Sequence, residues 1–256
     1  MSLAADTRLA DEVRPSPNHN MRRGGAEPDM LLLHYTGMPD ALGALERLCD
    51  PASEVSCHYF VFEDGRIVQL VAEARRAWHA GIAVWAGEQD INSCSIGVEI
   101  ANPGHDGGYP DFPEAQMQAV EALCRDIVER RAIAPQRVLA HSDVAPRRKS
   151  DPGEKFDWAR LARAGVGLWI EPAPILTGDD LGPGDAGPVI AGLQRDLVRF
   201  GYALTVNAVF DEATGDVVAA FQRHFRQVKV DGRADSSTIE TLRSLLQQVL
   251  GEIDSN

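Results

Sequence analysis

Short apolar runs bounded by polar residues recur through the first two thirds of the chain. Runs of this length are typical of buried strands. The longest of them divides at Glu63-Asp64-Gly65, and Asp-Gly is a strong signal for a hairpin. The pattern therefore predicts strands, with a hairpin in the longest run, in the segments 29–35, 57–71, 95–101 and 137–141.

Two segments between these runs show helical periodicity instead. In 113–133 the apolar residues Met117, Val120, Leu123 and Ile127 recur at helical spacing, and a weaker helical pattern covers 40–50. Strands mixed with long helices predict an α/β fold with a mixed central sheet flanked by helices.

The segment 171–187 is rich in proline and glycine, carries acidic residues and has no periodicity, as expected of a linker. It divides the chain into a first domain, 1–170, and a second, 188–256.

The second domain contains a repeat. The segments 206–214 and 230–238 match at valine, aspartate and threonine, 24 positions apart, and a helical pattern follows each. Asp211 and Asp235 are placed to cap those helices. With a helix over 188–202 they predict a three-helix module with little room for buried catalytic groups, hence a binding module.

Composition narrows the class of protein. Hydrophobic residues form 44% of the chain, which is enough for a packed core, and the net charge of −13 argues against a nucleic-acid partner. The four cysteines lack metal-site or disulfide spacing and are expected to be free thiols. We expect no membrane span, and the first residues show no signal peptide.

Four residues could carry chemistry. His34 and His141 end predicted strands, Asp151 follows in a proline-flanked loop, and Glu99 lies inside an apolar strand. Two imidazoles and a carboxylate with a fourth position open to water have the composition of a catalytic zinc site. Taken singly, each histidine also fits a satisfied polar residue and Asp151 a turn residue, whereas a carboxylate at position 99 is costly to bury without a role.

Six motifs follow one another in the first domain: LLLHYTGM, VSCHYFVFEDGRIVQLV, RRAWHAG, NSCSIGVEIANPG, FPEAQMQAVEALCRDI and VLAHSDVAPRRKSDPGEKFDW. In this order they resemble the zinc N-acetylmuramoyl-L-alanine amidases of the amidase_2 type, relatives of the peptidoglycan recognition proteins. The resemblance covers about residues 25–160, and the second domain is similar to the peptidoglycan-binding domain type 1.

The resemblance implies a role for each matching residue. His34, His141 and Asp151 match the Zn²⁺ ligands, Glu99 the residue that deprotonates the attacking water, and Lys149 the cation that steadies the oxyanion. The expected substrate-binding residues are Tyr35, His58, Trp78, His79 and Asn102, with a structural or pocket-wall role favoured for His58.

Other charged residues match less closely. Arg147 and Arg148 are expected on a solvated face, with contact to an acidic stem peptide as the alternative. His19, His105 and His224 match no motif and are expected at the surface.

The implied activity is hydrolysis of the amide between N-acetylmuramic acid and L-alanine in peptidoglycan or muropeptides, with the second domain tethering the enzyme to the wall. Deleting 177–256 is then expected to spare turnover of small substrates. A non-catalytic peptidoglycan-binding protein, a cytoplasmic amidase for soluble anhydro-muropeptides and a zinc peptidase remain alternatives. The binding module favours the cell envelope and the missing signal the cytoplasm; the oligomeric state stays open.

Overall fold

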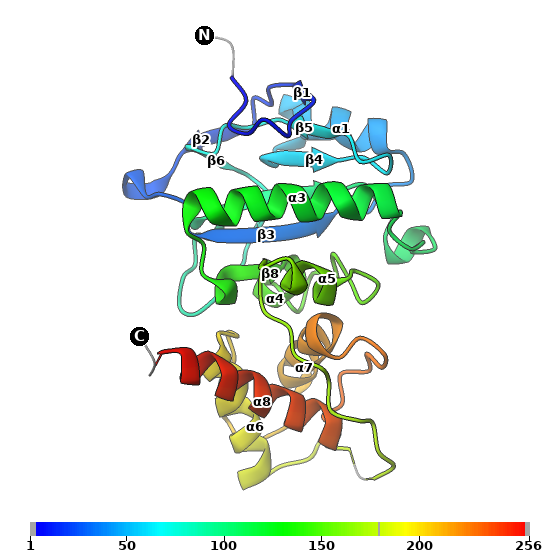
Figure 1. Ribbon diagram of the computed structural model, residues 1–256. Helices are drawn as coiled ribbons and strands as arrows, with labels where there is room; N and C mark the ends of the chain where they lie inside the picture. Colours follow the sequence, from blue (N-terminus) through cyan, green and yellow to red (C-terminus); the bar gives the residue numbers. More distant parts are fainter. Residues whose placement is uncertain (1–3, 179, 254–256) are drawn as a thin grey trace.

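The computed structural model describes residues 4–178 and 180–253. Its centre is a six-stranded mixed sheet in the order β1-β5-β4-β7-β3-β8 (Figure 1). Among the described strands of this sheet, only the β4–β5 pair is antiparallel. The strands are β1 (Glu12–Val13), β3 (Met30–Tyr35), β4 (Tyr59–Val61), β5 (Ile67–Gln69), β7 (Ser95–Ile100) and β8 (Val138–Ala140). The predicted α/β fold is confirmed.

Helix α3 (Glu114–Arg131) lies across one face of the sheet (Figure 1). Because successive side chains of a strand point to opposite faces, Leu31 and Leu33 of β3 pack with Val120 and Leu123 of this helix. Helix α1 (Ala41–Cys49) packs Leu45 and other apolar residues against β4 and β5 in a separate cluster. Met30 and Leu32, on the other face of β3, are buried in a further cluster, so β3 is covered on both faces and reads as an uninterrupted apolar run.

The expected strands and helices of this part are found within a few residues. The 57–71 segment forms the β4–β5 hairpin, with Phe60 opposite Val68 and Gly65 in the turn at φ 90°. One boundary differs from the prediction: β8 ends at Ala140, and His141 begins the short helix α4 (His141–Val144). The remaining elements had no counterpart in the prediction; they are β2 (His19–Met21), β6 (Arg75–Ala77), α2 (Ile91–Cys94), α5 (Trp158–Arg163) and strand β1.

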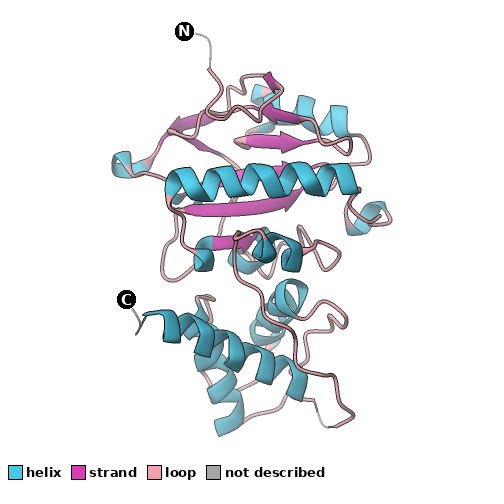
Figure 2. Cartoon of the chain, in the orientation of Figure 1, coloured by secondary structure: helices cyan, strands magenta, loops and turns pink. Residues whose placement is uncertain are grey.

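The C-terminal part consists of α6 (Pro188–Phe200), α7 (Glu212–Phe225) and α8 (Ser236–Ile253) (Figure 2). The predicted caps are confirmed: the Asp211 carboxylate accepts from the Thr214 N–H, and that of Asp235 from the Thr238 N–H. The repeat has a structural basis that the spacing did not show, because a completely buried glutamine holds each loop.

The two glutamines make equivalent contacts. The Gln194 side chain accepts from the N–H groups of residues 207 and 208 and donates to the Thr214 hydroxyl. Gln222 does the same with the N–H groups of 231 and 232 and the Thr238 hydroxyl. Each copy is therefore one loop-helix unit fastened to the preceding helix.

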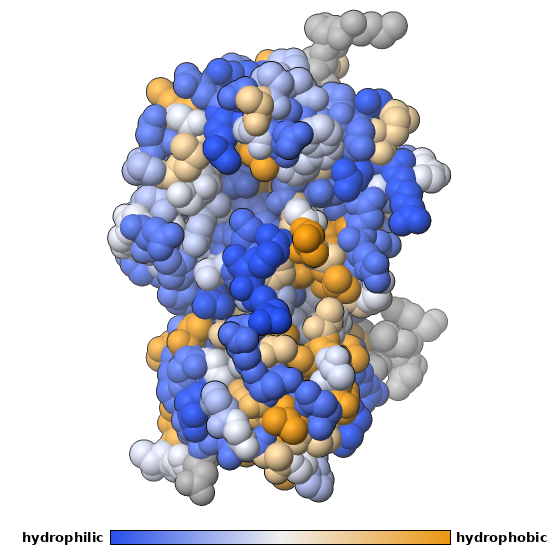
Figure 3. Space-filling model, turned by 180° about the vertical axis from the view of Figure 1, so that it is seen from behind, coloured by the Kyte–Doolittle hydropathy of each residue, from blue (hydrophilic) through white to orange (hydrophobic). Residues whose placement is uncertain are grey.

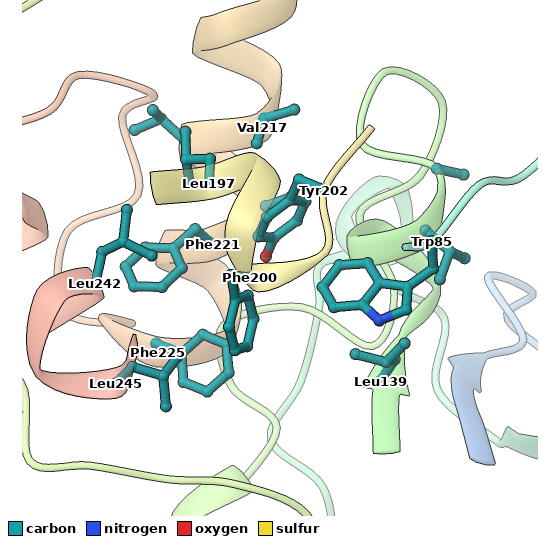
Figure 4. Packing of buried hydrophobic residues seen from close by; sticks show 14 of the residues in the cluster. Trp85, Leu139, Leu197, Phe200, Tyr202, Val217, Phe221, Phe225, Leu242 and Leu245 are labelled. Carbon is teal, nitrogen blue, oxygen red and sulfur yellow. The ribbon is translucent and has the colours of Figure 1, made fainter. Parts of the chain in front are cut away.

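The two parts of the chain share one hydrophobic core. Figure 4 shows Trp85 and Leu139 from the sheet domain beside Phe200, Tyr202 and Phe225 from the C-terminal helices. The connecting segment is also fixed, since Ala173 exchanges hydrogen bonds with Thr241 and Ser237 of α8. The C-terminal module is docked rather than loosely tethered.

The surface is mostly hydrophilic, with apolar residues gathered near the middle of the face that Figure 3 shows. Within residues 4–178 and 180–253, no helix has both the length and the hydrophobicity to cross a membrane. All four cysteines are free thiols.

Candidate active site

Two of the predicted site residues are neighbours in the sheet. His34 of β3 is in register with Glu99 of β7, so both side chains leave the sheet on the face opposite α3. Both lie close to the carboxyl ends of parallel strands, where ligand sites of α/β sheets form. The strand pairing alone brings together residues 65 positions apart.

The other two reach the same point from a helix and a loop. His141 begins α4, directly after β8, which pairs with β3. The loop returns to this helix, because the Ser142 N–H donates to the Asp151 carbonyl. Asp151 Oδ2 lies 3.1 Å from His34 Nδ1 and 3.0 Å from His141 Nδ1, and the two Nδ1 atoms are 2.9 Å apart.

Hydrogen bonds outside this cluster fix which nitrogen of each ring carries the proton. Ser95 Oγ donates to the Ile91 carbonyl, so it must accept from His79 Nε2–H, 3.2 Å away. Neutral His79 then accepts at Nδ1 from His34 Nε2, at 3.0 Å. His141 Nε2 donates to the Ala80 carbonyl, also at 3.0 Å. Both rings therefore direct an unprotonated Nδ1 into the cluster.

The charges of these groups agree with this assignment. Burial, helped by nearby His141, lowers the pKa of His34 to about 4. Burial and nearby His34 lower the pKa of His79 well below its ordinary value. Burial alone would raise the pKa of Asp151, but the two histidines lower it well below its usual range. The rings of His34 and His79 are neutral and the Asp151 carboxylate is ionised at neutral pH.

Three lone-pair donors therefore converge with no proton between them. Two Nδ1 lone pairs 2.9 Å apart repel each other unless a cation lies between them. Two imidazoles and a carboxylate are the ligands of choice for Zn²⁺, and the second hydrogen bond of each ring is the usual way to orient a metal-binding histidine. The residues present fit a metal ion.

His79 fits beside the cluster because position 97 is a glycine. A Cβ at Gly97 would lie 2.5 Å from the His79 ring. Position 97 lies on the same face of β7 as Glu99, since side chains two apart along a strand share a face. The absence of a side chain there makes room for the ring that holds His34.

Glu99 is half-buried, and its Oε2 is buried with no hydrogen-bond partner among the described residues. Burial, followed by repulsion from Asp151, raises the pKa of Glu99 well above its ordinary value, and Lys149 partly offsets the rise. An unpaired buried carboxyl is costly. Such a group beside a cavity is a candidate proton acceptor.

A cavity of about 360 Å³ opens over this cluster, within the usual range for ligand sites. Of the residues singled out in the sequence, it is lined by Tyr35, Trp78, His79, Glu99, His141, Lys149 and Asp151. Sequence reasoning missed Met38, Arg47, Leu48 and Ser56, which also line it. Arg47 lies on α1, and no motif or spacing marked that helix as part of the site.

Two of the expected substrate-binding residues, His58 and Asn102, are not among the residues that line the cavity. His58 is completely buried, does not line the cavity and uses both ring nitrogens inside the protein: Nδ1 accepts from the Gly97 N–H and Nε2 contacts the Arg75 carbonyl. Asn102 is buried too, and its side chain donates to the Pro110 carbonyl and accepts from the Gly104 N–H. The His58 ring thus links strands β6 and β7, and the Asn102 side chain holds the loop that follows β7.

The three consecutive cations have different surroundings. Lys149 borders the cavity, and its ammonium forms no ion pair within the described part of the chain. Exposed Arg147 pairs with Glu212 and Asp216 of α7, and Arg148 donates to the carbonyls of Ala80 and Ile82.

A buried His-His-Asp cluster that opens on a cavity, with a free carboxyl beside it, has the make-up of a metal-assisted hydrolytic site. Comparison with known proteins agrees with this class. Residues 24–154 match the family model described as N-acetylmuramoyl-L-alanine amidase (Amidase_2), and residues 186–242 match a putative peptidoglycan binding domain. The chain belongs to the Amidase_2 family, and it is an N-acetylmuramoyl-L-alanine amidase.

Relatives support this assignment over most of the length. The N-acetylmuramoyl-L-alanine amidase AmiD of Escherichia coli (strain K12) is 38% identical, covering 86% of this chain and 82% of AmiD. The 1,6-anhydro-N-acetylmuramyl-L-alanine amidase AmpD of the same strain is 35% identical over 57% of this chain and 87% of AmpD.

Solved structures show the same fold. AmiD from E. coli, in complex with the substrate anhydro-N-acetylmuramic acid-L-Ala-D-gamma-Glu-L-Lys, matches with a TM-score of 0.74 at 35% identity, over 90% of this chain and 92% of AmiD. AmpDH3 from Pseudomonas aeruginosa, in complex with anhydromuramic pentapeptide, matches with a TM-score of 0.71 at 31% identity, over 90% and 95%. The catalytic interpretation is therefore favoured over a non-catalytic recognition protein.

Proposed function

We propose that His34 Nδ1, His141 Nδ1 and the Asp151 carboxylate hold Zn²⁺, and that this centre hydrolyses the amide between N-acetylmuramic acid and L-alanine. The observation that carries the proposal is the fixed protonation of both rings, which leaves three lone-pair donors facing one another. When bound, Zn²⁺ supplies Lewis acidity for amide hydrolysis.

Glu99 acts as general base and then general acid. Its unpaired Oε2 faces no competing donor in the described chain, so it is free to take a proton from the attacking water and pass it to the leaving amine. Burial raises the pKa of Glu99 and Lys149 partly lowers it, and a raised pKa suits a group that takes up a proton and returns it.

Lys149 stabilises the negative charge that develops on the scissile carbonyl oxygen. Lys149 lines the cavity, and no acid within residues 4–178 and 180–253 forms an ion pair with it. A donor of this kind typically contributes about 3–4 kcal/mol to the transition state.

The substrates are muropeptides, with anhydro-muropeptides the first class to test. Both ligand-bound relatives carry anhydromuramic peptides. The cavity suits an anionic peptide stem because Arg47 and Lys149 place two cations on its lining, in a chain of net charge −13. Tyr35, Trp78 and His79 supply the aromatic walls. Domain 1–170 would carry the activity, with 171–187 as the connection and 188–256 as the peptidoglycan-binding part.

The test is mass spectrometry of the products released from purified peptidoglycan and from anhydro-muropeptides, with and without a chelator. Free stem peptides that begin at L-alanine, lost on chelation and restored by zinc, are expected. Products cut inside the stem would instead identify a peptidase. Activity that survives complete metal removal would exclude the zinc assignment.

A further inference from the structure

Asp143 is a buried acid two residues after His141, and the C-terminal module supplies two of its hydrogen bonds. Its Oδ1 accepts from the Tyr202 hydroxyl at 2.7 Å, and its Oδ2 from His224 Nδ1–H, also at 2.7 Å. The carboxylate is essentially inaccessible, at 1% exposure. A buried carboxylate needs such partners, and bonds to an ionised acceptor are the stronger ones.

The same carboxylate holds the backbone that presents the metal ligand. Asp143 Oδ2 also accepts from the Ala140 N–H at 2.8 Å, so it closes the turn between β8 and His141. Helix α4 has only four residues, too few to be stable on its own. The position of His141 therefore depends on contacts made around this turn.

His224 is built into the interface rather than the surface, which corrects the sequence-based expectation. Its ring stacks on Trp158 of the sheet domain, with ring centroids 3.8 Å apart, and on Phe225 at 3.9 Å. It is 1% exposed, and Nε2 has no partner in the part of the chain that the structure describes. The bond from Nδ1–H to Asp143 is therefore the one hydrogen bond of this ring among the described residues.

The close approach of Tyr202 to Asp143 depends on the preceding residue, Gly201. Gly201 has φ 141°, and a Cβ there would lie 2.5 Å from the Trp85 indole. The Ala86 N–H donates to the Gly201 carbonyl at 2.8 Å, and Trp85 packs against Tyr202. Figure 4 shows these rings facing one another across the shared core. These contacts hold the C-terminal module close enough for the Tyr202 hydroxyl to reach Asp143.

We propose that the C-terminal module is a positioning part of the active site: Tyr202 and His224 hold the Asp143 carboxylate, and through it the turn that presents His141 to the metal. Both are positioning residues, since neither touches the cluster itself. A test by enzyme activity rests on the proposed function, whereas a test by zinc affinity rests only on His34, His141 and Asp151 being the metal ligands.

The experiment compares the full-length chain with Tyr202→Phe, His224→Phe and the double variant. Phenylalanine keeps the stacking and packing in both places but removes the donors. The matched control is Gln227→Ala, which removes another bond between the two parts, from Gln227 Nε2 to the Phe156 carbonyl. Zinc dissociation constants are measured by competition with a chromogenic chelator at a temperature where circular dichroism shows every variant folded.

The double variant is expected to bind zinc about 10-fold more weakly, the low end for residues that orient a ligand indirectly. Its kcat on a soluble muropeptide should fall by a similar factor while KM stays unchanged, and Gln227→Ala should remain within about 2-fold of wild type. If Tyr202 and His224 only stabilised the fold, the double variant would have a lower Tm but an unchanged zinc affinity and an unchanged kcat.

Wild-type zinc affinity in a folded double variant would overturn the proposal, as would an equal loss in Gln227→Ala. If the double variant does not fold, Tyr202→Phe decides in the same way, because it removes a single hydroxyl. A wild-type chain that binds zinc but releases no stem peptide would defeat the proposed function alone, and the affinity comparison would still test the positioning.

Discussion

The tautomers of His34 and His141 determine which ring nitrogens of this site can bind a metal ion. The order Ser95, His79, His34 forms a hydrogen-bonded series that ends in a bare Nδ1, and His141 reaches the same state through the Ala80 carbonyl. Each ring would otherwise be free to choose its tautomer. The hydrogen bonds of the two rings thus leave both Nδ1 lone pairs free to bind a metal ion.

Glu99→Gln should retain zinc and lose activity by about 10²–10⁴ in kcat, the scale of a general base. The amide keeps the shape of the side chain but cannot accept the proton. Glu114→Gln, at the exposed start of α3, is the matched control and should leave kcat unchanged. Kinetics and zinc content of the purified variants measure both. Near-normal turnover of Glu99→Gln would remove this residue from the mechanism.

Glu73 makes folding stability sensitive to acid. Burial alone would raise the pKa of Glu73, but hydrogen bonds from Arg130, Tyr59 and Arg131 lower it from 4.5 to about 2. A depressed folded-state pKa contributes stability that is fully present above the unfolded value and is lost as pH falls through the folded one.

We therefore expect the free energy of unfolding to decrease between about pH 4.5 and 2. Glu73→Gln should be less stable at pH 7 and should show a shallower loss over that window. Urea denaturation at a series of pH values measures this. Parallel pH profiles for wild type and variant would show that Glu73 does not carry the effect.

At the scale of elements, the register of β3 against β7 builds the site. It sets His34 beside Glu99 and Leu32 beside Gly97, so the ligand, the acid and the space for His79 all lie on one face. A slip of β7 by one residue against β3 would turn Glu99 and Gly97 toward α3 and leave His34 on the opposite face.

Gly97→Ala is expected to weaken zinc binding by about 10- to 100-fold, the usual effect of disturbing a group that orients a ligand. The new methyl must displace the His79 ring and, with it, the hydrogen bond to His34 Nε2. Gly192→Ala on α6 is the control, since a Cβ there meets nothing within 4 Å. Chelator competition measures both; unchanged affinity in Gly97→Ala would mean that His79 does not orient the ligand.

At the scale of the molecule, the shared core makes two domains into one folding unit. The cluster that includes Met30, Leu32 and Leu139 of the sheet domain continues into Leu197, Phe221 and Leu245 of the helices. Deleting 177–256 would expose this apolar surface to water. The truncated chain would then be less stable and prone to aggregate. We therefore predict that the truncated chain loses its activity on small substrates, in contrast to the expectation from the sequence.

The full chain should therefore unfold in one cooperative transition, with equal calorimetric and van't Hoff enthalpies. Differential scanning calorimetry of the metal-free protein tests this. Two resolved transitions would indicate that the module folds independently, and would weaken the case for its positioning role.

The sequence by itself determined much of this protein. The apolar periodicities give the strands, α3 and the three C-terminal helices, because each follows from local spacing and capping, as at Asp211 and Asp235. The motifs around His34, Glu99, His141 and Asp151 indicate the family and the chemistry, since residue type and order survive in the sequence.

Only the tertiary structure decided the rest. Tautomers, the role of Gly97, the place of Arg47 in the cavity and the internal roles of His58 and Asn102 depend on partners far away in the chain. The burial of His224 against Asp143, 81 positions earlier, is the clearest case. A local pattern cannot show such contacts, because packing between distant segments, not spacing within one, determines which polar atoms remain unpaired.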